Sequence, residues 1–285
     1  RSHGIAAKWS GNQCVSEIFK PQYMTILDKI IADKKTEVAN RKKLVTLDVL
    51  CTAPYFNRKC ISLKDRLTSS SSGVIAEFKR KSPSKGWIHE EADVVDVTSG
   101  YDEAGAAGIS VLTDSKYFGG ISEDLTAARP YVHCPILRKD FMIDVYQLFE
   151  AKAMGADVIL LIAAALTVGD TLELARQAKA LSLEVLLEIH NKEELVYIND
   201  FVDMVGVNNR NLKTFEVSTD VSFELAGLIP DKFVKISESG ISSPETVNML
   251  KVSGYQGFLM GENFMKELNP AESLRTFIER LELLK

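Results

Sequence analysis

The stretch IAEFKRKSPSKGW, residues 75–87, begins as a buried β-strand and ends among charges. Glu77 and Lys79 stand two positions apart, so in a strand they point to the same face. Pro83 then breaks the strand, because proline lacks the N–H that a strand ladder needs. Charges are costly to remove from water unless they are paired. A core strand that ends on this pair therefore predicts a polar cavity at its carboxyl end.

Apolar runs like this first one recur along the chain, each separated from the next by a polar break and a helical pattern. The eight runs are VIAEFK (74–79), GISVLT (108–113), CPILRK (134–139), DVILLIA (157–163), EVLLEI (184–189), DMVGVN (203–208), FVKISE (233–238) and GFLMG (257–261). Most of them are near-continuous apolar stretches, which are typical of parallel strands covered by helices.

The segments between the runs predict helices, because apolar residues recur in them at spacings of three and four. The predicted helices are 92–103, 144–154, 167–181, 193–198, 218–228, 244–252 and 270–284. Eight strands alternating with helices predict a (β/α)8 TIM barrel. An open, doubly wound sheet is the alternative. It would usually have fewer strands and a glycine-rich first turn, and the sequence contains no G-x-G-x-x-G motif.

An extra helical segment precedes the first strand. Residues 25–44 form a lysine-rich amphipathic pattern that begins with a capping box at Thr25. Looser sequence follows as far as Ser72, and we expect the whole segment to pack either across the bottom of the barrel or beside the rim of the cavity. Residues 1–23 are interpreted as a leader introduced during cloning. Residues 24–285 would then form a single barrel domain with an N-terminal helical extension.

Composition restricts the classes of function. The 285 residues suffice for one large core, and the net charge of -5 argues against nucleic acid as a partner. No run of 18 apolar residues is present, so we expect no membrane span. The four cysteines form no C-x-x-C pair, which favours reduced thiols in a cytoplasmic protein, with Cys134 buried. The scattered histidines and cysteines predict no metal site.

Polar and charged side chains end five of the eight predicted strands. The carboxyl ends of the strands form the active face of such barrels. The residues placed there are Glu77, Lys79, Lys139, Glu188, Asn208, Arg210 and Glu238. A single charge at a strand end points to water more often than not. Five strands that end in this way together predict that the side chains meet in one cavity.

The loops after the last two strands predict a site for an anion. Ser239 and Gly240 follow the seventh strand, and Gly261 and Glu262 follow the eighth. Loops in these places of a barrel often hold a phosphate group on backbone N–H groups at a helix N-terminus. Lys79 is positioned in the sequence to supply a cation to the same phosphate.

Several of these segments together resemble the indole-3-glycerol-phosphate synthase family, and the resemblance covers about residues 24–285. The matching segments are IAEFKRKSPS (75–84), VLTDSKYFGG (111–120), LRKDFMID (137–144), LLEIH (186–190), GVNNRNL (206–212), SESGI (237–241) and FLMGENFM (258–265). The first is highly specific, whereas the last two are shared more widely among phosphate-binding barrels. The resemblance implies a step of tryptophan biosynthesis, the ring closure, decarboxylation and dehydration of 1-(2-carboxyphenylamino)-1-deoxyribulose 5-phosphate, without a metal or organic cofactor.

The resemblance also implies roles for individual residues. Lys139 would be the general acid of ring closure, Glu188 an acid/base in the dehydration, and Glu77 the partnering carboxylate. The substrate-binding residues that it implies are Lys79, Ser82, Phe118, Phe141, Asn208, Arg210, Leu212, Glu238, Ser239, Gly240, Leu259, Gly261 and Glu262. The partner would be a phosphorylated small molecule, and the chain would be a monomer or a weak homo-oligomer. Lys235, inside the seventh strand, is expected to line the barrel or to support residues that do.

Alternatives remain open at the level of sequence. Another phosphate-sugar barrel is one of them. Phosphoribosylanthranilate isomerase would need a cysteine and an aspartate at strand ends, but Cys134 begins the third strand. A Schiff-base aldolase would use Lys79 or Lys139 covalently. A catalytically silent barrel that serves as a scaffold is the last, although it should have lost some of its charged strand ends. The loop 115–122, with two adjacent glycines, is the predicted lid.

Overall fold

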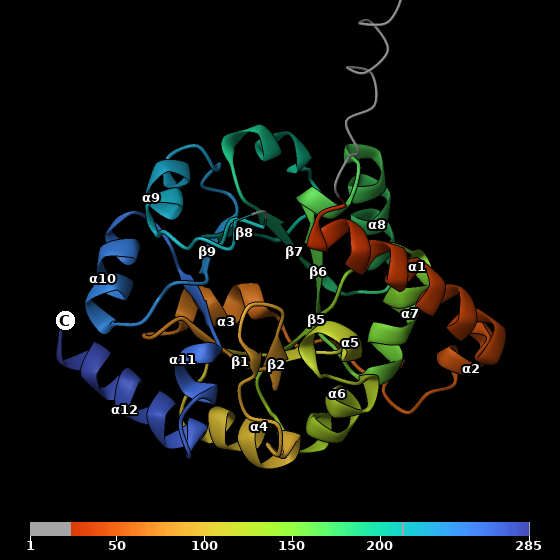
Figure 1. Cartoon of the computed structure of the whole chain (residues 1–285), viewed down its shortest axis with the longest axis horizontal. Helices are drawn as coiled ribbons and strands as arrows, with labels where there is room; N and C mark the ends of the chain where they lie inside the picture. Colours follow the sequence, from red (N-terminus) through yellow and green to blue (C-terminus); the bar gives the residue numbers. More distant parts are fainter. Residues whose placement is uncertain (1–23, 213, 285) are drawn as a thin grey trace, which may run out of the picture.

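The computed structural model describes residues 24–212 and 214–284, so the predicted leader lies outside the described residues. Eight parallel strands close into a barrel in the order β1-β10-β9-β8-β7-β6-β5-β4 (Figure 1). They are β1 (Val74–Phe78), β4 (Gly108–Leu112), β5 (Ile136–Lys139), β6 (Val158–Ile162), β7 (Glu184–Ile189), β8 (Met204–Asn208), β9 (Val234–Glu238) and β10 (Gly257–Met260). The predicted TIM barrel is confirmed, and each predicted run contains one barrel strand.

Helices form the outer layer and separate consecutive strands (Figure 1). They are α4 (Val94–Glu103), α6 (Ser122–Ala128), α7 (Val145–Met154), α8 (Val168–Ala180), α9 (Asp220–Ala226), α10 (Pro244–Val252) and α12 (Pro270–Leu283). Short polar side chains begin several of them, as Asp144 does for α7 and Thr167 for α8. One predicted helix is not an α-helix, because segment 193–198 overlaps a 3-10 helix, η3 (Lys192–Tyr197).

Shorter elements lie in the loops. They are α2 (Leu47–Cys51), α3 (Leu63–Ser69), α5 (Ser115–Phe118), α11 (Glu262–Met265), the 3-10 turns η1 (Arg129–Tyr131) and η2 (Ala163–Ala165), and a hairpin of β2 (Lys81–Ser82) and β3 (Gly86–Trp87). The hairpin continues directly from β1, so the Ser-Pro break of the opening stretch leads into a small antiparallel ribbon at the mouth of the barrel. The charges after β1 are therefore presented by an ordered loop.

Helix α3 closes the amino end of the barrel. Its Leu63 and Leu67 are fully or almost fully buried and join the apolar cluster of the barrel interior. A Cβ on Gly108, the first residue of β4, would lie 2.6 Å from Cδ1 of Leu63. Glycine is therefore required there for the close approach of the helix. This end of the barrel is filled by apolar contacts, which leaves the opposite end for polar groups.

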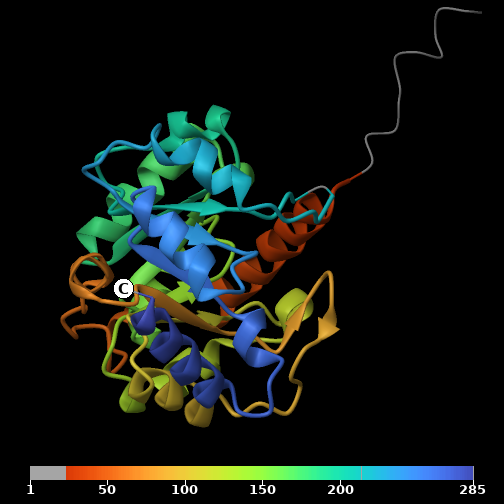
Figure 2. The same ribbon diagram turned by 90° about the vertical axis from the view of Figure 1, so that its left-hand side faces the viewer.

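Helix α1 (Ile26–Leu44) lies at the other end, beside the rim of the cavity. Figure 2 shows α1 and the β2–β3 hairpin extending from the same side of the barrel. The predicted capping box is confirmed, since Thr25 and Asp28 each accept a hydrogen bond from the other's backbone N–H. Buried Lys34 attaches the helix to the barrel, with Nζ 3.0 Å from Asp114 and 2.9 Å from Asp140. Of the two predicted positions, α1 takes the rim, and α3 in the looser stretch takes the bottom.

Lys235 does not line the barrel, so the first of the two roles expected for it is wrong. Strand alternation turns Val234 and Ile236 into the interior cluster and Lys235 toward the helical layer. Its Nζ donates to the carbonyl oxygen of Ala226 at 2.8 Å and lies 3.0 Å from Asp231. Ala226 is the last residue of α9, where carbonyl groups lack partners within the helix and favour a cation. The buried lysine thus caps a neighbouring helix.

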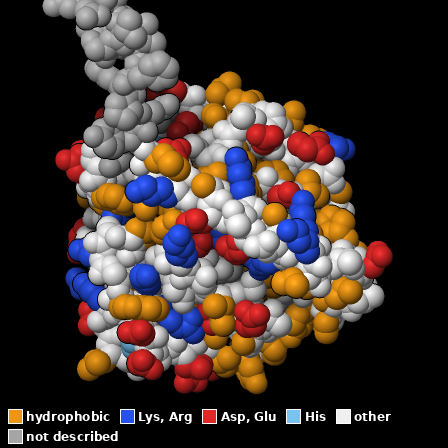
Figure 3. Space-filling view, turned by 45° about the vertical axis from the view of Figure 1, so that its right-hand side comes forward, with side chains coloured by type: hydrophobic (Ala, Val, Ile, Leu, Met, Phe, Trp, Pro, Cys, Tyr) orange, Lys and Arg blue, Asp and Glu red, His pale blue; other side chains and the backbone are white. Residues whose placement is uncertain are grey.

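The surface mixes side chains of every kind. On the face seen in Figure 3, Lys and Arg side chains lie among hydrophobic and acidic ones rather than in one basic patch. Across residues 24–212 and 214–284, no helix has both the length and the apolar character needed to cross a bilayer. Cys134 is buried, with 2% of its surface exposed, as the sequence predicted.

Candidate active site

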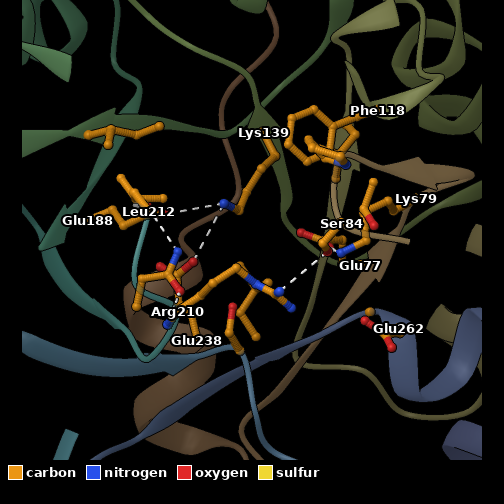
Figure 4. A pocket seen from close by; sticks show the side chains of 18 of the residues that line it. Glu77, Lys79, Ser84, Phe118, Lys139, Glu188, Arg210, Leu212, Glu238 and Glu262 are labelled. Atoms are coloured by element: carbon orange, nitrogen blue, oxygen red, sulfur yellow. Dashed lines mark hydrogen bonds and ion pairs between the residues drawn. The ribbon is translucent and has the colours of Figure 1, made fainter. Parts of the chain in front are cut away.

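A cavity opens at the carboxyl ends of the barrel strands (Figure 4). Every residue predicted to bind or convert a substrate lines it. These residues are Glu77, Lys79, Ser82, Phe118, Lys139, Phe141, Glu188, Asn208, Arg210, Leu212, Glu238, Ser239, Gly240, Leu259, Gly261 and Glu262. Among the described residues, no group of three or more His, Cys, Asp or Glu side chains is arranged to hold a metal ion. Barrel closure explains the convergence, because parallel strands bring all their carboxyl ends to one face.

Lys139 lies at the centre of the charged cluster. Its Nζ is 3.2 Å from Oε2 of Glu188 and 3.6 Å from Oε2 of Glu238 (Figure 4). The three residues come from the ends of β5, β7 and β9, so no pair of them is adjacent in sequence. Both carboxylates are buried, and the Lys139 side chain is 14% exposed. Water therefore screens these charges only weakly.

The cluster moves the pKa of each member in its own direction. Burial alone would lower the pKa of Lys139, but the surrounding carboxylates, Glu188 first, outweigh burial and raise it. Burial would raise the pKa of Glu188, yet the charge of Lys139 and contacts with His190 hold it below its usual range. Burial raises the pKa of Glu238 to about 8, against the attraction of Lys139. At neutral pH the cavity thus holds an ammonium, a carboxylate and a carboxylic acid side by side.

Glu77 and Lys79 form a second charged pair at the end of β1. Nζ of Lys79 lies 2.6 Å from Oε1 of Glu77, while the ring of Phe78 between them is buried in the outer core. A Cβ on Gly261 would lie 2.6 Å from Oε1 of Glu77. Only glycine therefore lets the loop after β10 pass so close, and the pair lies directly beside the backbone of the predicted anion site.

Asn208 and Arg210 connect the cluster with the rim. Nδ2 of Asn208 donates to Oε1 of Glu188 at 3.1 Å, and Oδ1 of Asn208 accepts from the backbone N–H of Arg210 at 3.0 Å. The Arg210 guanidinium reaches across the mouth and donates to Oγ of Ser84 at 3.4 Å (Figure 4). Ser84 belongs to the turn of the β2–β3 hairpin, so two loops meet over the cavity.

The loop after β9 has a strained backbone. Ser239 and Gly240 have φ angles of 66° and 73°, in the left-handed region that a residue other than glycine rarely adopts. Nδ2 of Asn209 holds the turn by donating to the carbonyl oxygen of Ser239 at 3.0 Å. Such strain is common where a backbone must face a ligand. The side chain of Glu262, in contrast, is 40% exposed and lies 3.8 Å from Lys85.

Aromatic and aliphatic side chains form one wall of the cavity. The rings of Phe118 and Phe141 lie 6.1 Å apart between centroids, at a tilt of 39°. Helix α1 contributes apolar residues to the same cavity, and the loop after β8 contributes another. These additional residues are Ile26, Leu27, Ile30 and Phe215. The wall gives a flat aromatic group an apolar surface next to the charged cluster.

Sequence reasoning missed the α1 residues, Phe215 and Ser84 as parts of the cavity. The apolar stripe of α1 was visible, but a stripe does not say which surface it covers. His190, which does not line the cavity, was missed as a neighbour of Glu188. Its only signal was its place two positions after Glu188, which puts both side chains on one face of the chain. Its ring lies 3.2 Å from the Glu188 carboxylate.

The fold and the site define a class, the TIM-barrel enzymes that act on phosphorylated small molecules. Within that class, the sequence profile described as indole-3-glycerol phosphate synthase matches residues 27–277, and the chain belongs to this family. The indole-3-glycerol phosphate synthase of Bacteroides thetaiotaomicron is 51% identical over 257 residues, which cover 90% of this chain and 99% of that protein. The one from Dechloromonas aromatica is 43% identical over 258 residues, covering 88% and 98%.

Solved structures with little sequence similarity share the fold. A chain of the tryptophan synthase complex from Pyrococcus furiosus superposes with a TM-score of 0.58 at 18% identity, covering 75% of this chain and 98% of that one. KGPDC from Streptococcus mutans gives a TM-score of 0.56 at 12% identity, covering 74% and 97%. These likenesses concern the barrel architecture alone.

Proposed function

We propose that the side chains at the mouth of the barrel carry out the reaction of the family. The chain is a decarboxylating lyase of tryptophan biosynthesis, which converts 1-(2-carboxyphenylamino)-1-deoxyribulose 5-phosphate to indole-3-glycerol phosphate. The observation that supports the residue roles is the position of the Lys139 ammonium between Glu188 and Glu238 in a buried cavity. Family membership and this cluster together favour the synthase over an aldolase or a silent barrel.

Ring closure needs an acid beside the ketone of the substrate. An aromatic carbon attacks the ketone carbon, a C–C bond forms, and the ketone oxygen takes on negative charge. The Lys139 ammonium stabilises that charge and donates a proton to the oxygen. Its pKa is raised by the surrounding carboxylates, so the amine is protonated when the substrate binds. The attacking ring carbon carries the carboxylate, so loss of CO2 from this carbon returns an electron pair to the ring and restores its aromaticity.

Dehydration needs a base and an acid in sequence. The new hydroxyl group leaves as water after protonation, and a proton is removed from the substrate to form the indole double bond. We assign the acid/base role in this step to Glu188, which is held as a carboxylate next to Lys139. Glu77 is the partnering carboxylate, paired with Lys79. Groups whose environments separate their pKa values in this way suit successive proton transfers.

The remaining residues bind the two ends of the substrate. Backbone N–H groups of the loops at Ser239-Gly240 and at Gly261 hold the phosphate, with Lys79 as its cation. Arg210 and Asn208 position the carboxylate and the sugar chain. The other substrate-binding residues are Ser82, Phe118, Phe141, Leu212, Glu238, Leu259 and Glu262, of which the apolar ones contact the aromatic ring.

We also propose that residues 24–285 form one domain, and that the chain acts in the cytoplasm as a monomer or a weak homo-oligomer. The three cysteines in the described part of the chain, Cys51, Cys60 and Cys134, are free thiols, which agrees with a reducing compartment. Sedimentation velocity at micromolar concentration tests the oligomeric state. A stable dimer at these concentrations would contradict that proposal.

The test of function is a fluorescence assay for the indole product, run with the carboxyphenylamino substrate and a chelator. We expect turnover that does not depend on added metal. Treatment with borohydride in the presence of substrate should leave no covalent adduct on Lys79 or Lys139. A stable adduct would instead support the Schiff-base mechanism, and absence of fluorescent product would contradict the synthase activity of this chain.

A further inference from the structure

His190 is a half-buried histidine that the proposed mechanism leaves without a role. It follows the last residue of β7 and lies two positions after Glu188, but it is not among the residues that line the cavity. Its side chain is 9% exposed. Nε2 of the ring lies 3.2 Å from Oε1 of Glu188 and makes no aligned hydrogen bond, and Nδ1 lies 3.2 Å from Oε2 of Glu194. The ring is thus enclosed between two carboxylates.

This arrangement determines the protonation state of the ring. A neutral imidazole has one N–H and one lone pair. One of its nitrogens would then direct a lone pair at a carboxylate, which is unfavourable in a poorly solvated site. An imidazolium donates from both nitrogens. In agreement with this geometry, burial alone would lower the pKa of His190, but the contacts with Glu188 and Glu194 raise it to about 10.

Glu194 fixes the orientation of the ring. Besides its contact with Nδ1, Oε2 of Glu194 accepts a hydrogen bond from the backbone N–H of His190 at 2.8 Å. Glu194 is itself held at the start of η3, because its own N–H donates to the side chain of Asn191 at 3.1 Å. The histidine therefore cannot rotate away from Glu188 without breaking contacts with this turn.

We propose that His190 is a positioning residue for Glu188, with a cationic ring that Glu194 holds in place. The ring places its positive charge 3.2 Å from Oε1 of Glu188, to which Asn208 also donates, while Oε2 is directed at Lys139. Its charge also keeps Glu188 ionised, and therefore able to accept a proton from the substrate. This inference rests on the proposed acid/base role of Glu188. The titratable groups that face this pair are Lys139 from β5, Glu238 from β9 and Glu194 from η3.

The test replaces the ring by an uncharged donor in His190→Gln. We expect kcat to fall about ten-fold or more, and KM to change less than about two-fold, because His190 does not line the cavity. Without the nearby positive charge Glu188 is protonated more easily, so the acid limb of the pH profile of kcat should move up by about one pH unit. Glu194→Gln should change kcat in the same direction by a smaller factor.

Glu193→Gln is the matched control. This neighbouring carboxylate is exposed and makes none of the contacts of Glu194, so kcat and the pH profile should stay as in the wild type. A His190→Gln variant with wild-type kcat and an unmoved acid limb would overturn the inference, as would a loss confined to KM. Either result would mean that His190 contributes to packing and does not position Glu188.

Two further measurements separate the possible failures. In wild-type protein labelled with 15N-histidine, both ring nitrogens of His190 should carry protons at pH 7.5, and a neutral ring at that pH would overturn the inference without any variant. Glu188→Gln tests the acid/base role of Glu188 on which the inference rests. If that variant keeps near-normal kcat, the role of Glu188 fails and the inference fails with it. If it is inactive while His190→Gln is unaffected, only the inference fails.

Discussion

Lys139 is shared by the carboxyl groups of Glu188 and Glu238 from different strands, and the proposed chemistry depends on this one ammonium. Lys139→Ala removes the proton donor of ring closure and takes the ammonium away from the Glu188 carboxylate. We expect kcat to fall by about 10²–10⁴. Glu188→Gln should lower kcat by a similar factor, because the amide cannot take up a proton in the dehydration. Product fluorescence at saturating substrate measures both.

Lys59→Ala is the control for these variants, since Lys59 is exposed and does not line the cavity. It should keep the wild-type kcat. Circular dichroism should show that all three variants retain the folded barrel, because each variant keeps the apolar core intact. Near-normal turnover in a folded Lys139→Ala or Glu188→Gln protein would contradict the roles proposed for these residues.

Glu238 gives a prediction about stability as a function of pH. In the folded chain this buried carboxyl keeps its proton up to about pH 8, whereas its ordinary pKa is 4.5. Between these values the folded state binds more protons than the unfolded state, so the free energy of unfolding falls as pH rises. Glu238→Gln cannot ionise. We expect it to be more stable than the wild type at pH 8.5, by roughly 4 kcal/mol, since each pKa unit corresponds to about 1.4 kcal/mol.

Urea unfolding at pH 5 and pH 8.5 measures this difference. The advantage of Glu238→Gln should be small at pH 5, where the wild-type carboxyl is protonated in the folded chain. An advantage of the same size at both pH values would show that amide packing, and not ionisation of Glu238, separates the two proteins.

At the scale of elements, the sequence predicts well those whose pattern depends on their own residues. The run of Val74–Phe78 is apolar except for Glu77 and becomes a barrel strand, and Thr25 caps α1 through a local hydrogen bond. Segment 193–198 is too short to form a stable α-helix, so it closes into a 3-10 turn capped by Asn191. Two leucines of helix α3 pack into the bottom of the barrel, and this position could not be predicted because it depends on the folded barrel.

The same distinction holds for the candidate site. Charges at strand ends could be assigned to one cavity because barrel topology alone brings those ends together. Phe215 and Ile30 could not be assigned to the cavity from the sequence, because their positions depend on how a loop and a helix dock on the barrel. His190 stands between these cases. Its spacing from Glu188 was visible in the segment LLEIH, but the second carboxylate, Glu194, becomes its neighbour only through the turn that follows.

The ion pairs of Lys34 are expected to hold helix α1 against the barrel. Its Nζ lies within 3.0 Å of Asp114, Asp140 and Glu37, and 1% of the side chain is exposed. Lys34→Met would leave buried Asp114 without its cation and Asp140 with Arg138 alone, which is expected to cost about 3–5 kcal/mol of stability. Because α1 supplies part of the apolar wall, the KM for substrate should rise as well. Urea unfolding and initial-rate kinetics measure the two effects.

Lys35→Met is the matched control, since it makes the same chemical change at the next position, where the side chain is exposed. It should change stability by less than about 0.5 kcal/mol and leave KM unaltered. If Lys34→Met behaved like Lys35→Met, the ion pairs of Lys34 would not be what holds α1 against the barrel.

At the scale of the whole molecule, the barrel separates stability from function. The amino end is filled by Leu63 and Leu67 of α3, which contact the apolar interior. The carboxyl end gathers charged groups, buries several of them and holds them by mutual pairing. Such polar clusters are poor sources of stability. The apolar end and the helical layer therefore stabilise the fold, which allows the mouth to keep groups that favour chemistry.

The distribution of charge over the molecule leads to a final prediction. The chain has a net charge of -5, whereas Lys79, Lys139 and Arg210 line the cavity, so any attraction for an anionic substrate is local. Raising salt from about 50 to 500 mM shortens the screening length from about 14 to about 4 Å. We expect kcat/KM to fall several-fold over this range, with kcat changed less than about two-fold.

Arg210→Gln should lower kcat/KM at low salt and flatten its salt dependence, whereas Lys232→Gln, at an exposed site outside the cavity, should leave both unchanged. If kcat/KM fell equally with salt in the wild type and in Arg210→Gln, the part assigned to Arg210 would be contradicted. A charge that attracts the substrate at the mouth must be screened by salt.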